Sequence, residues 1–428
     1  MVAHSLRDVL CRHADSDLGL LKIDFKNAFN VVDRGAFMKS TFESLPALSN
    51  WTNWCYGGPS VLLYDHRYVI LSTSGVQQGD PLGPLYFCFG LNPIVNEISR
   101  LRPVYQKWYM DDGGIVADVA TLKQVWRILV EKGPALGLKL NAEKCEWSWL
   151  RASCSDPCPI DPRIGSVPTS EVCMLGVPLG TAEKNGDFVA KKLFSRLDKA
   201  LAQLGEWEDA QAAFYLLRIS YGIVRATHFM RTTAWDHWSE HGKEFDRKLR
   251  GVAERILGFP FNPPDAYVQA CLTPSLGGLG LRRTEDHAQA AFAASFRESM
   301  VTAKENWIVP PEVTAHLKGA QKFASYKIDK AIHEALVDRA PTLRERQRLL
   351  RVTELHAGAF VTALPSTDDG MDTVMRPDHF RIAVAYRLGV PVVEDGVRCP
   401  LCSKPWINMA IMPPAAQGMV DSSSVTTA

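Results

Sequence analysis

The stretch Trp108-Tyr-Met-Asp-Asp-Gly-Gly-Ile-Val-Ala117 decides the fold. Apolar and aromatic residues flank two adjacent aspartates, which predicts a strand, a tight turn and a second strand. A further apolar segment, Leu20-Leu-Lys-Ile, predicts a buried strand that ends at Asp24. An Asp-Asp pair is most often only a turn, but neighbouring carboxylates repel each other and a divalent cation relieves that repulsion. The pattern therefore predicts that Asp24, Asp111 and Asp112 form a two-metal site for Mg²⁺, with Mn²⁺ as an alternative ion.

The rest of the chain alternates between helical patterns and loops. Residues 61–72 predict a hairpin around Asp65-His66, residues 75–83 a loop, and residues 151–170 a loop or insertion. A short strand is expected within residues 173–180. Helices are expected over 27–45, 84–100, 122–136, most of 187–257, 284–304 and 326–355, with a proline-rich break at 259–264.

Composition limits the class of protein. The 428 residues are 46% hydrophobic and 22% charged, as in an ordinary globular protein, and no apolar run is long enough to span a membrane. A net charge of +1 argues against a uniformly basic nucleic-acid coat. These features exclude a secreted or membrane protein and leave the choice between cytoplasm and nucleus open.

Two local features have more than one interpretation. Residues 318–351 carry nine Lys or Arg against four acids, which fits either a phosphate-binding helix or a solvated helix face. Cys399 and Cys402 have the spacing of zinc ligands, but a zinc site needs two further ligands. The other eight cysteines are scattered and predict reduced thiols.

Five blocks in order carry a resemblance to a known family. They are Asp24-Phe-Lys-Asn-Ala-Phe29, Gly75-Val-Gln-Gln-Gly-Asp-Pro-Leu-Gly-Pro84, Tyr109-Met-Asp-Asp112, Gly137-Leu-Lys-Leu-Asn-Ala-Glu-Lys144 and Leu175-Gly-Val-Pro-Leu-Gly180. This series resembles the palm motifs of reverse transcriptases, specifically those of non-LTR retrotransposons. The resemblance implies an RNA-directed DNA polymerase, with an RNA template, a DNA primer and deoxynucleoside triphosphates as partners.

The resemblance also implies roles for single residues. Asp24 and Asp111 would be the main metal ligands and Asp112 a supporting one, while Lys144 would be a general acid for the departing pyrophosphate. Leu175 and Gly176 would hold the primer end. The remaining implied residues would contact the nucleotide or template, and Phe29 among them would exclude a ribose 2′-hydroxyl; they are Phe25, Phe29, Gln78, Gly79, Tyr109 and Met110.

The chain departs from the family pattern at both ends. Only residues 1–19 precede the first motif, where the family has a fingers segment that binds the triphosphate, so we expect weak or no activity from this chain alone. A separate chain could supply the fingers or an endonuclease. After Cys402, a reading frame shifted by one base at Pro405 would restore a Gly-Asp-His-Ala…Cys continuation, so we also expect a frameshifted C-terminus.

The predicted fold is α/β: a small antiparallel palm sheet backed by helices, followed by a helical thumb and more helices. The expected divisions are a short remnant (1–19), the palm (20–180), a thumb-like region (181–260), a C-terminal helical region (261–395) and a disordered tail (396–428). Two rivals remain. One is a non-catalytic nucleic-acid-binding remnant of a retrotransposon polymerase. The other is an RNA-dependent RNA polymerase, against which Met110 and Phe29 argue.

Overall fold

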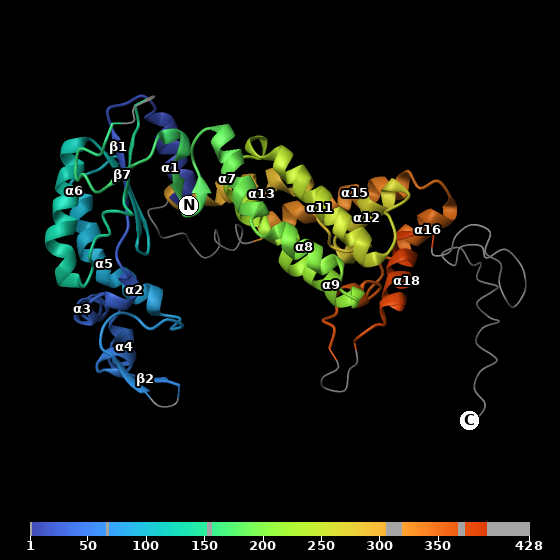
Figure 1. Ribbon diagram of the computed structural model, residues 1–428, viewed down its shortest axis with the longest axis horizontal. Helices are drawn as coiled ribbons and strands as arrows, with labels where there is room; N and C mark the ends of the chain where they lie inside the picture. Colours follow the sequence, from blue (N-terminus) through green and yellow to red (C-terminus); the bar gives the residue numbers. More distant parts are fainter. Residues whose placement is uncertain (1, 66–67, 152–155, 305–318, 367–372, 392–428) are drawn as a thin grey trace, which may run out of the picture. The chain divides into compact units, whose positions relative to one another are not determined.

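The computed structural model describes residues 2–65, 68–151, 156–304, 319–366 and 373–391 (Figure 1). The chain divides into two compact units, Met1–Lys184 and Asn185–Ala428, and each is described by itself. Lys318 of the basic stretch and the expected tail with Cys399 and Cys402 lie outside the described residues. Within the described ranges, no helix combines the length and the apolar character needed to cross a lipid bilayer.

The first unit is built on a five-stranded sheet in the order β4-β5-β1-β6-β7. Its strands are β1 (Gly19–Ile23), β4 (Tyr105–Tyr109), β5 (Asp112–Ala117), β6 (Glu146–Trp149) and β7 (Gly165–Ser166). The central strand β1 pairs antiparallel with β5 and β6, so Leu21 lies opposite Ile115 on one side and Trp147 on the other. The expected strand, turn and strand around the Asp-Asp pair are confirmed as the β4–β5 hairpin.

Alternate side chains of each strand point to opposite sides of this sheet. Other elements of the first unit pack against both of these faces. Leu21 and Ile115 pack with the buried side chains of α5 (Gly83–Arg100) and α6 (Val119–Lys132). Leu20 and Val116 pack on the other side, against α1 and a small hairpin; Figure 1 shows α1 on the side of the sheet away from α5 and α6. These elements are α1 (Val2–Arg12), β8 (Cys173–Met174) and β9 (Val177–Pro178). The segment expected as a short remnant thus contains a helix, and its Leu6 is fully buried.

The chain between β1 and α5 forms a helical and hairpin layer. The helical run expected over residues 27–45 is two helices, because Asp33 interrupts it and its carboxylate accepts a hydrogen bond from the Ala36 backbone N–H at 2.7 Å. The elements are α2 (Ala28–Val31), α3 (Arg34–Ser44), α4 (Ser49–Tyr56), β2 (Ser60–Tyr64) and β3 (Tyr68–Ser72). The predicted hairpin is therefore confirmed.

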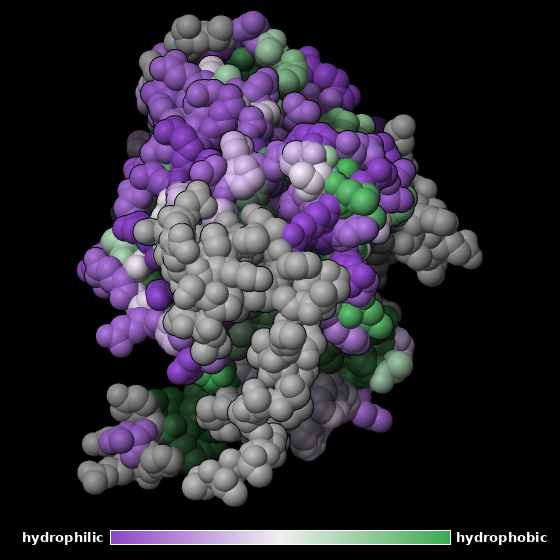
Figure 2. Space-filling view, turned by 90° about the vertical axis from the view of Figure 1, so that its right-hand side faces the viewer, coloured by the Kyte–Doolittle hydropathy of each residue, from purple (hydrophilic) through white to green (hydrophobic). Residues whose placement is uncertain are grey.

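The β2–β3 hairpin exposes an unusual amount of apolar surface. Six of its side chains are 50–70% exposed, namely Val61, Leu62, Leu63, Val69, Ile70 and Leu71. Figure 2 shows hydrophobic atoms gathered at the low end of the molecule, where Figure 1 draws β2. Because successive residues point to opposite sides, both faces of the hairpin are apolar.

The second unit is helical. Its helices are α7 (Ala182–Phe194), which begins in the first unit, α8 (Leu197–Gly205), α9 (Ala210–Leu216), α10 (Thr227–Thr232), α11 (Ser239–Leu257), α12 (Pro264–Cys271), α13 (Thr284–Lys304), α15 (Ala320–Asp338), α16 (Leu343–Arg351), α17 (Ala359–Thr362) and α18 (Pro377–Leu388). One core joins residues from Val189 to Val390, including Phe214, Phe245 and Phe380. This core therefore runs across residue 260, the expected end of the thumb-like region.

Three expectations for the second unit have clear outcomes. The break at residues 259–264 and the helix over 284–304 are confirmed. The single helix expected over 326–355 is wrong: α15 ends at Asp338 and α16 begins at Leu343. Pro341 lies between them, and the Thr342 hydroxyl accepts a hydrogen bond from the Glu345 N–H at 3.1 Å, which starts a new helix.

Candidate active site

Sheet pairing places two of the expected carboxylates side by side. Ile23, the last residue of β1, pairs with Gly113 of β5, so Asp24 follows directly opposite Asp112. Asp24 continues the alternation of Leu20 and Lys22 and therefore faces the side of the sheet that carries α1. This arrangement follows from the apolar pattern of the two strands, because a shift by one residue would turn every side chain to the wrong face.

The third carboxylate lies in the turn of the β4–β5 hairpin. Tyr109 pairs with Asp112, so Met110 and Asp111 form a two-residue turn. Met110 has a positive φ of 57°, which is uncommon for a residue with a side chain. The turn brings Asp111 next to Asp112 at the same end of the sheet as Asp24.

The charges of Asp111 and Asp24 act on the Asp112 carboxyl. The pKa of the Asp112 carboxyl is raised, first by partial desolvation, then by the negative charge of Asp111 and, less strongly, by that of Asp24. The positive charge of Lys22 opposes this shift. A bound cation would relieve the same repulsion, and carboxylate oxygens are the ligands that Mg²⁺ prefers. The donor set therefore fits a divalent metal ion.

The three carboxylates, as they are oriented in the structure, do not form a complete metal-binding site. Among the described residues, no group of three or more His, Cys, Asp or Glu side chains is close enough to hold a metal ion as it stands. Asp24 and Asp111 are half-buried and Asp112 is exposed, so the side chains have room to rotate. Metal binding by all three would require such a rotation.

The segment that resembles the fourth motif holds the backbone of Asp24. Its carbonyl accepts a hydrogen bond from the Asn141 N–H at 2.9 Å, and its N–H donates to the Cys145 sulfur at 3.4 Å. Burial raises the pKa of the Cys145 thiol to about 11, so the sulfur is a neutral partner at pH 7. Gly137 begins this segment with a φ of 75°, in close contact with the Val31 backbone.

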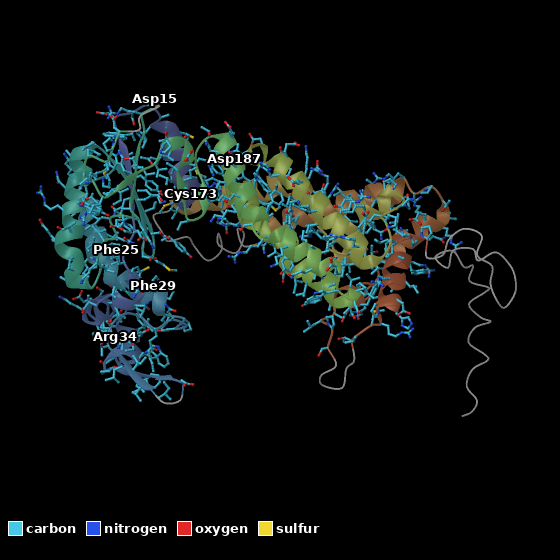
Figure 3. The ribbon with its side chains drawn as sticks, in the orientation of Figure 1. Asp15, Phe25, Phe29, Arg34, Cys173 and Asp187 are labelled. Atoms are coloured by element: carbon cyan, nitrogen blue, oxygen red, sulfur yellow. The ribbon has the colours of Figure 1, made fainter. Side chains whose placement is uncertain are left out.

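The two phenylalanines of the first motif have different environments. Phe25 is 3% exposed and its ring stacks on Trp108 with centroids 6.3 Å apart, so the ring belongs to the core. Phe29 is half-buried and stacks on Phe87 at 4.5 Å and 8°. Figure 3 shows Phe25, Phe29 and Arg34 following one another from the sheet towards the β2–β3 hairpin.

Residues 75–83, called the glycine-rich loop below, lie close to α2, the helix that carries Phe29. Gln78 is exposed, and its amide nitrogen donates to the Asn30 side-chain oxygen at 3.4 Å. Gly79 has a φ of 96° with open space around it, which allows a close approach of backbone to another molecule. Gln78, Gly79 and the exposed Tyr109 can therefore be reached from solvent.

Arg34 fixes this loop and was missed by sequence reasoning. Its guanidinium is buried and donates to the carbonyls of Gly58, Ser72, Ser74 and Gly75 at 2.9–3.3 Å, and also to the Ser72 hydroxyl. Burial lowers the pKa of this guanidinium. No signal in the sequence marks Arg34, because its partners lie 24 to 41 residues away.

Tyr56 and Asp80 support the loop from a second side and were also missed. The Tyr56 hydroxyl donates to the Asp80 carboxylate at 2.5 Å and accepts from the Gln77 N–H at 3.1 Å. Burial, followed by the hydrogen bond to Asp80, strongly raises the pKa of the Tyr56 hydroxyl, which stays protonated. The loop is thus anchored on both sides of Gln78.

The remaining expected residues lie on turns. Lys144 is exposed in the turn after Asn141. Leu175 and Gly176, with φ of 53° and 71°, form the tip of the β8–β9 hairpin. This hairpin packs over β5, because a Cβ added at Gly114 would lie 3.5 Å from the Met174 methyl group.

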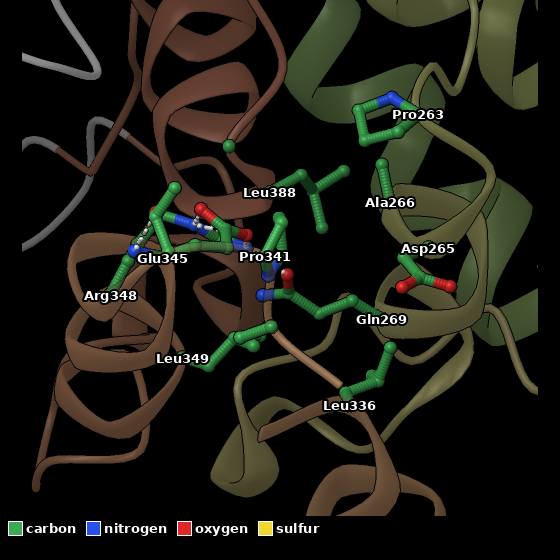
Figure 4. A pocket seen from close by; sticks show the side chains of 13 residues that line it. Pro263, Asp265, Ala266, Gln269, Leu336, Pro341, Glu345, Arg348, Leu349 and Leu388 are labelled. Carbon is green, nitrogen blue, oxygen red and sulfur yellow. Dashed lines mark hydrogen bonds and ion pairs between the residues drawn. The ribbon is translucent and has the colours of Figure 1, made fainter. Parts of the chain in front are cut away.

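Part of the basic stretch is used inside the second unit. The Arg348 side chain lies in a pocket of about 270 Å³, where it is bound to Glu345, to the Gln269 oxygen and to the Arg387 carbonyl (Figure 4). Arg339 pairs with Asp265 at 2.8 Å. Arg348 therefore stabilises the helical core, whereas Arg339 forms an ion pair at the surface and others of the stretch remain exposed.

Comparison with known proteins defines the class of the first unit. Residues 3–179 match the family model described as reverse transcriptase (RNA-dependent DNA polymerase). This part of the chain is a reverse transcriptase domain, as the five motifs predicted. The chain is also similar to a protein of a retrotransposable element: it is 28% identical over 285 residues to the retrotransposable element SLACS 132 kDa protein of Trypanosoma brucei gambiense. The match covers 64% of this chain and 23% of that protein, so the chain spans about a quarter of its relative's length.

Solved structures of telomerase are also similar to this chain. One is the telomerase of Candida tropicalis in complex with a fragment of telomeric RNA. The match covers 82% of this chain and 51% of the telomerase chain, at 14% sequence identity and a TM-score of 0.37. The match to the telomerase of Candida albicans covers 83% of this chain and 52% of the telomerase chain, at 13% sequence identity and a TM-score of 0.34. The predicted α/β fold is confirmed by the five-stranded sheet, which is antiparallel except for the parallel β6–β7 pair, and by its helices.

Proposed function

We propose that this chain is an RNA-directed DNA polymerase that adds deoxynucleotides to a primer 3′ end, with Asp24, Asp111 and Asp112 as metal ligands. One observation carries the proposal. Within a reverse transcriptase domain, the sheet register and the turn bring three carboxylates to one end of the sheet, where partial desolvation and then the charges of Asp111 and Asp24 raise the pKa of Asp112. Reverse transcriptase domains generally use divalent metal ions; two Mg²⁺ ions here would stabilise negative charge on the attacking and leaving oxygens.

The chain's own residues would position the reactants around this site. Gln78 and Gly79 are exposed on an anchored loop and would lie against the incoming nucleotide and the template base. Phe29 would place its ring against the sugar and exclude a 2′-hydroxyl. Tyr109 and Met110 would contact the nucleotide from the turn. Phe25 would contribute only its backbone, because its ring is in the core.

Two further positions complete the proposal. Leu175 and Gly176 would hold the primer end, since their hairpin packs over β5, the strand that begins with Asp112. Lys144 is exposed and would supply a proton or a positive charge to the departing pyrophosphate. The RNA template and DNA primer would be the macromolecular partners.

Primer extension tests this function. Purified chain is compared with Asp111→Asn on poly(rA)/oligo(dT), with Mg²⁺ and either dTTP or UTP. We expect slow but measurable incorporation of dTTP, preferred over UTP, by the wild type and none by the variant. Template–primer binding without extension would instead support the non-catalytic binding remnant, and efficient use of UTP would support the RNA polymerase alternative.

A further inference from the structure

A charge pair, Lys22 and Glu146, lies beside the acidic cluster, which is the group formed by Asp24, Asp111 and Asp112. Lys22 is on β1, two residues before Asp24 and on the same face of the sheet. Its neighbour on β6 is Glu146, and the Lys22 ammonium lies 2.7 Å from a Glu146 carboxylate oxygen. The two side chains are 22% and 36% exposed.

The charges that face this pair come from every strand around it. Asp24 extends β1, Asp111 and Asp112 come from the β4–β5 hairpin, and Lys107 of β4 lies opposite Gly114 on the same face. The positive charge of Lys22 acts directly on Asp112 and favours its ionised form. Lys22 therefore stands between two negative regions, the acidic cluster on one side and Glu146 on the other.

We propose that Lys22 and Glu146 set the affinity of the acidic cluster for divalent cations. The ammonium is a fixed counter-charge that offsets part of the repulsion among the carboxylates and competes electrostatically with an incoming cation. Glu146 holds that ammonium on the β6 side and adds its own negative charge. Lys22 and Glu146 are thus positioning residues that act through the carboxylates, and this inference rests on the proposed function of that site.

Electrostatics give the two halves of the pair opposite effects. A unit charge about 7 Å from a divalent ion changes the dissociation constant about five- to tenfold at low salt, even in a water-like dielectric. Removal of the ammonium in Lys22→Met therefore tightens cation binding. Removal of the carboxylate charge in Glu146→Gln weakens it. A pair that served only to stabilise the fold would make both variants weaker or leave both unchanged.

Mn²⁺ alone is the probe, because free Mn²⁺ is counted by electron paramagnetic resonance without any catalytic turnover. The dissociation constant is measured for the wild type, Lys22→Met, Lys22→Arg, Glu146→Gln and Lys123→Met, the last being an exposed lysine on α6. Asp111→Asn shows whether the ion binds at the acidic cluster. Thermal unfolding of each variant shows that it is folded.

The expected result is a dissociation constant about five- to tenfold lower in Lys22→Met and several-fold higher in Glu146→Gln, with Lys22→Arg and Lys123→Met near the wild type. Both shifts shrink in 0.5 M salt, by screening to a Debye length of about 4 Å. Shifts in the same direction, or shifts below about twofold, overturn the charge-pair proposal alone. Binding that Asp111→Asn leaves intact refutes the metal site itself.

Discussion

Replacement of Arg34 by methionine tests how the glycine-rich loop is held. Methionine fills a similar length of side chain but has no donor, so the carbonyls of Gly58, Ser72, Ser74 and Gly75 all lose their partner. Arg34→Lys keeps the charge, but an ammonium cannot reproduce the planar fork that serves these acceptors together. Arg127, an exposed residue on α6, gives the matched control Arg127→Met.

The magnitude follows from the number of bonds lost. A hydrogen bond from a charged donor contributes about 1 kcal/mol or more, and a buried carbonyl left without a donor costs free energy as well. Five bonds from one buried guanidinium therefore place the loss of unfolding free energy in Arg34→Met at about 3–5 kcal/mol. We expect about half of that loss for Arg34→Lys, and less than about 0.5 kcal/mol for Arg127→Met.

Urea unfolding monitored by tryptophan fluorescence gives the free energies, and hydrogen–deuterium exchange locates the change. Exchange is expected to rise over residues 72–80 before it rises in β1, because Arg34 joins that loop to α3. An Arg34→Met protein within about 1 kcal/mol of the wild type, with unchanged exchange over 72–80, would refute this reasoning.

Two further predictions concern stability. In Gly137→Ala the added Cβ would lie 1.9 Å from the Val31 carbonyl oxygen, at a φ of 75°, so we expect urea unfolding to show a loss of unfolding free energy of about 2–4 kcal/mol. The control is Gly165→Ala, whose Cβ would meet open space and which should cost less than about 0.5 kcal/mol. Equal losses in the two variants would contradict the prediction. Burial raises the pKa of the Asp246 carboxyl to about 6. The folded state therefore binds this proton more tightly than the unfolded state does. As a result, the free energy of unfolding falls by about 3 kcal/mol in total as the pH rises from about 4 to above 6. Urea unfolding across that range should show a flatter pH dependence in Asp246→Asn, and parallel profiles for the two proteins would exclude Asp246 as the cause.

The sequence predicts the parts of this protein that local patterns encode. The strands β1, β4 and β5 follow from apolar runs next to aspartates, and α5 and α13 follow from helical periodicity. The motifs also identify the carboxylates, because their spacing around strand ends is itself a local property. The break between α15 and α16 was missed although Pro341 marks it, so that error came from giving periodicity more weight than proline.

Other features depend on residues far apart in the chain. Lys22 meets Glu146 across 124 residues, and Phe25 stacks on Trp108, so neither the charge pair nor the burial of the Phe25 ring is visible in a local pattern. The partners of Arg34 are backbone carbonyls, which any sequence provides. The pairing order of the sheet is equally non-local, since β1 lies between strands whose paired residues follow it by some 90 to 130 residues.

The central claim is that the carboxylates at one end of the sheet perform nucleotidyl transfer, and single-nucleotide incorporation tests it most directly. Asp24→Asn is compared with Asp118→Asn; Asp118 caps α6 through the Thr121 N–H at 2.9 Å, and asparagine caps a helix equally well. With primer, RNA template, Mg²⁺ and one dNTP, we predict a loss of at least about a thousandfold in Asp24→Asn and a rate near that of the wild type in Asp118→Asn. Incorporation by Asp24→Asn within tenfold of the wild type, or a wild type that binds template–primer without extending it, would contradict the account.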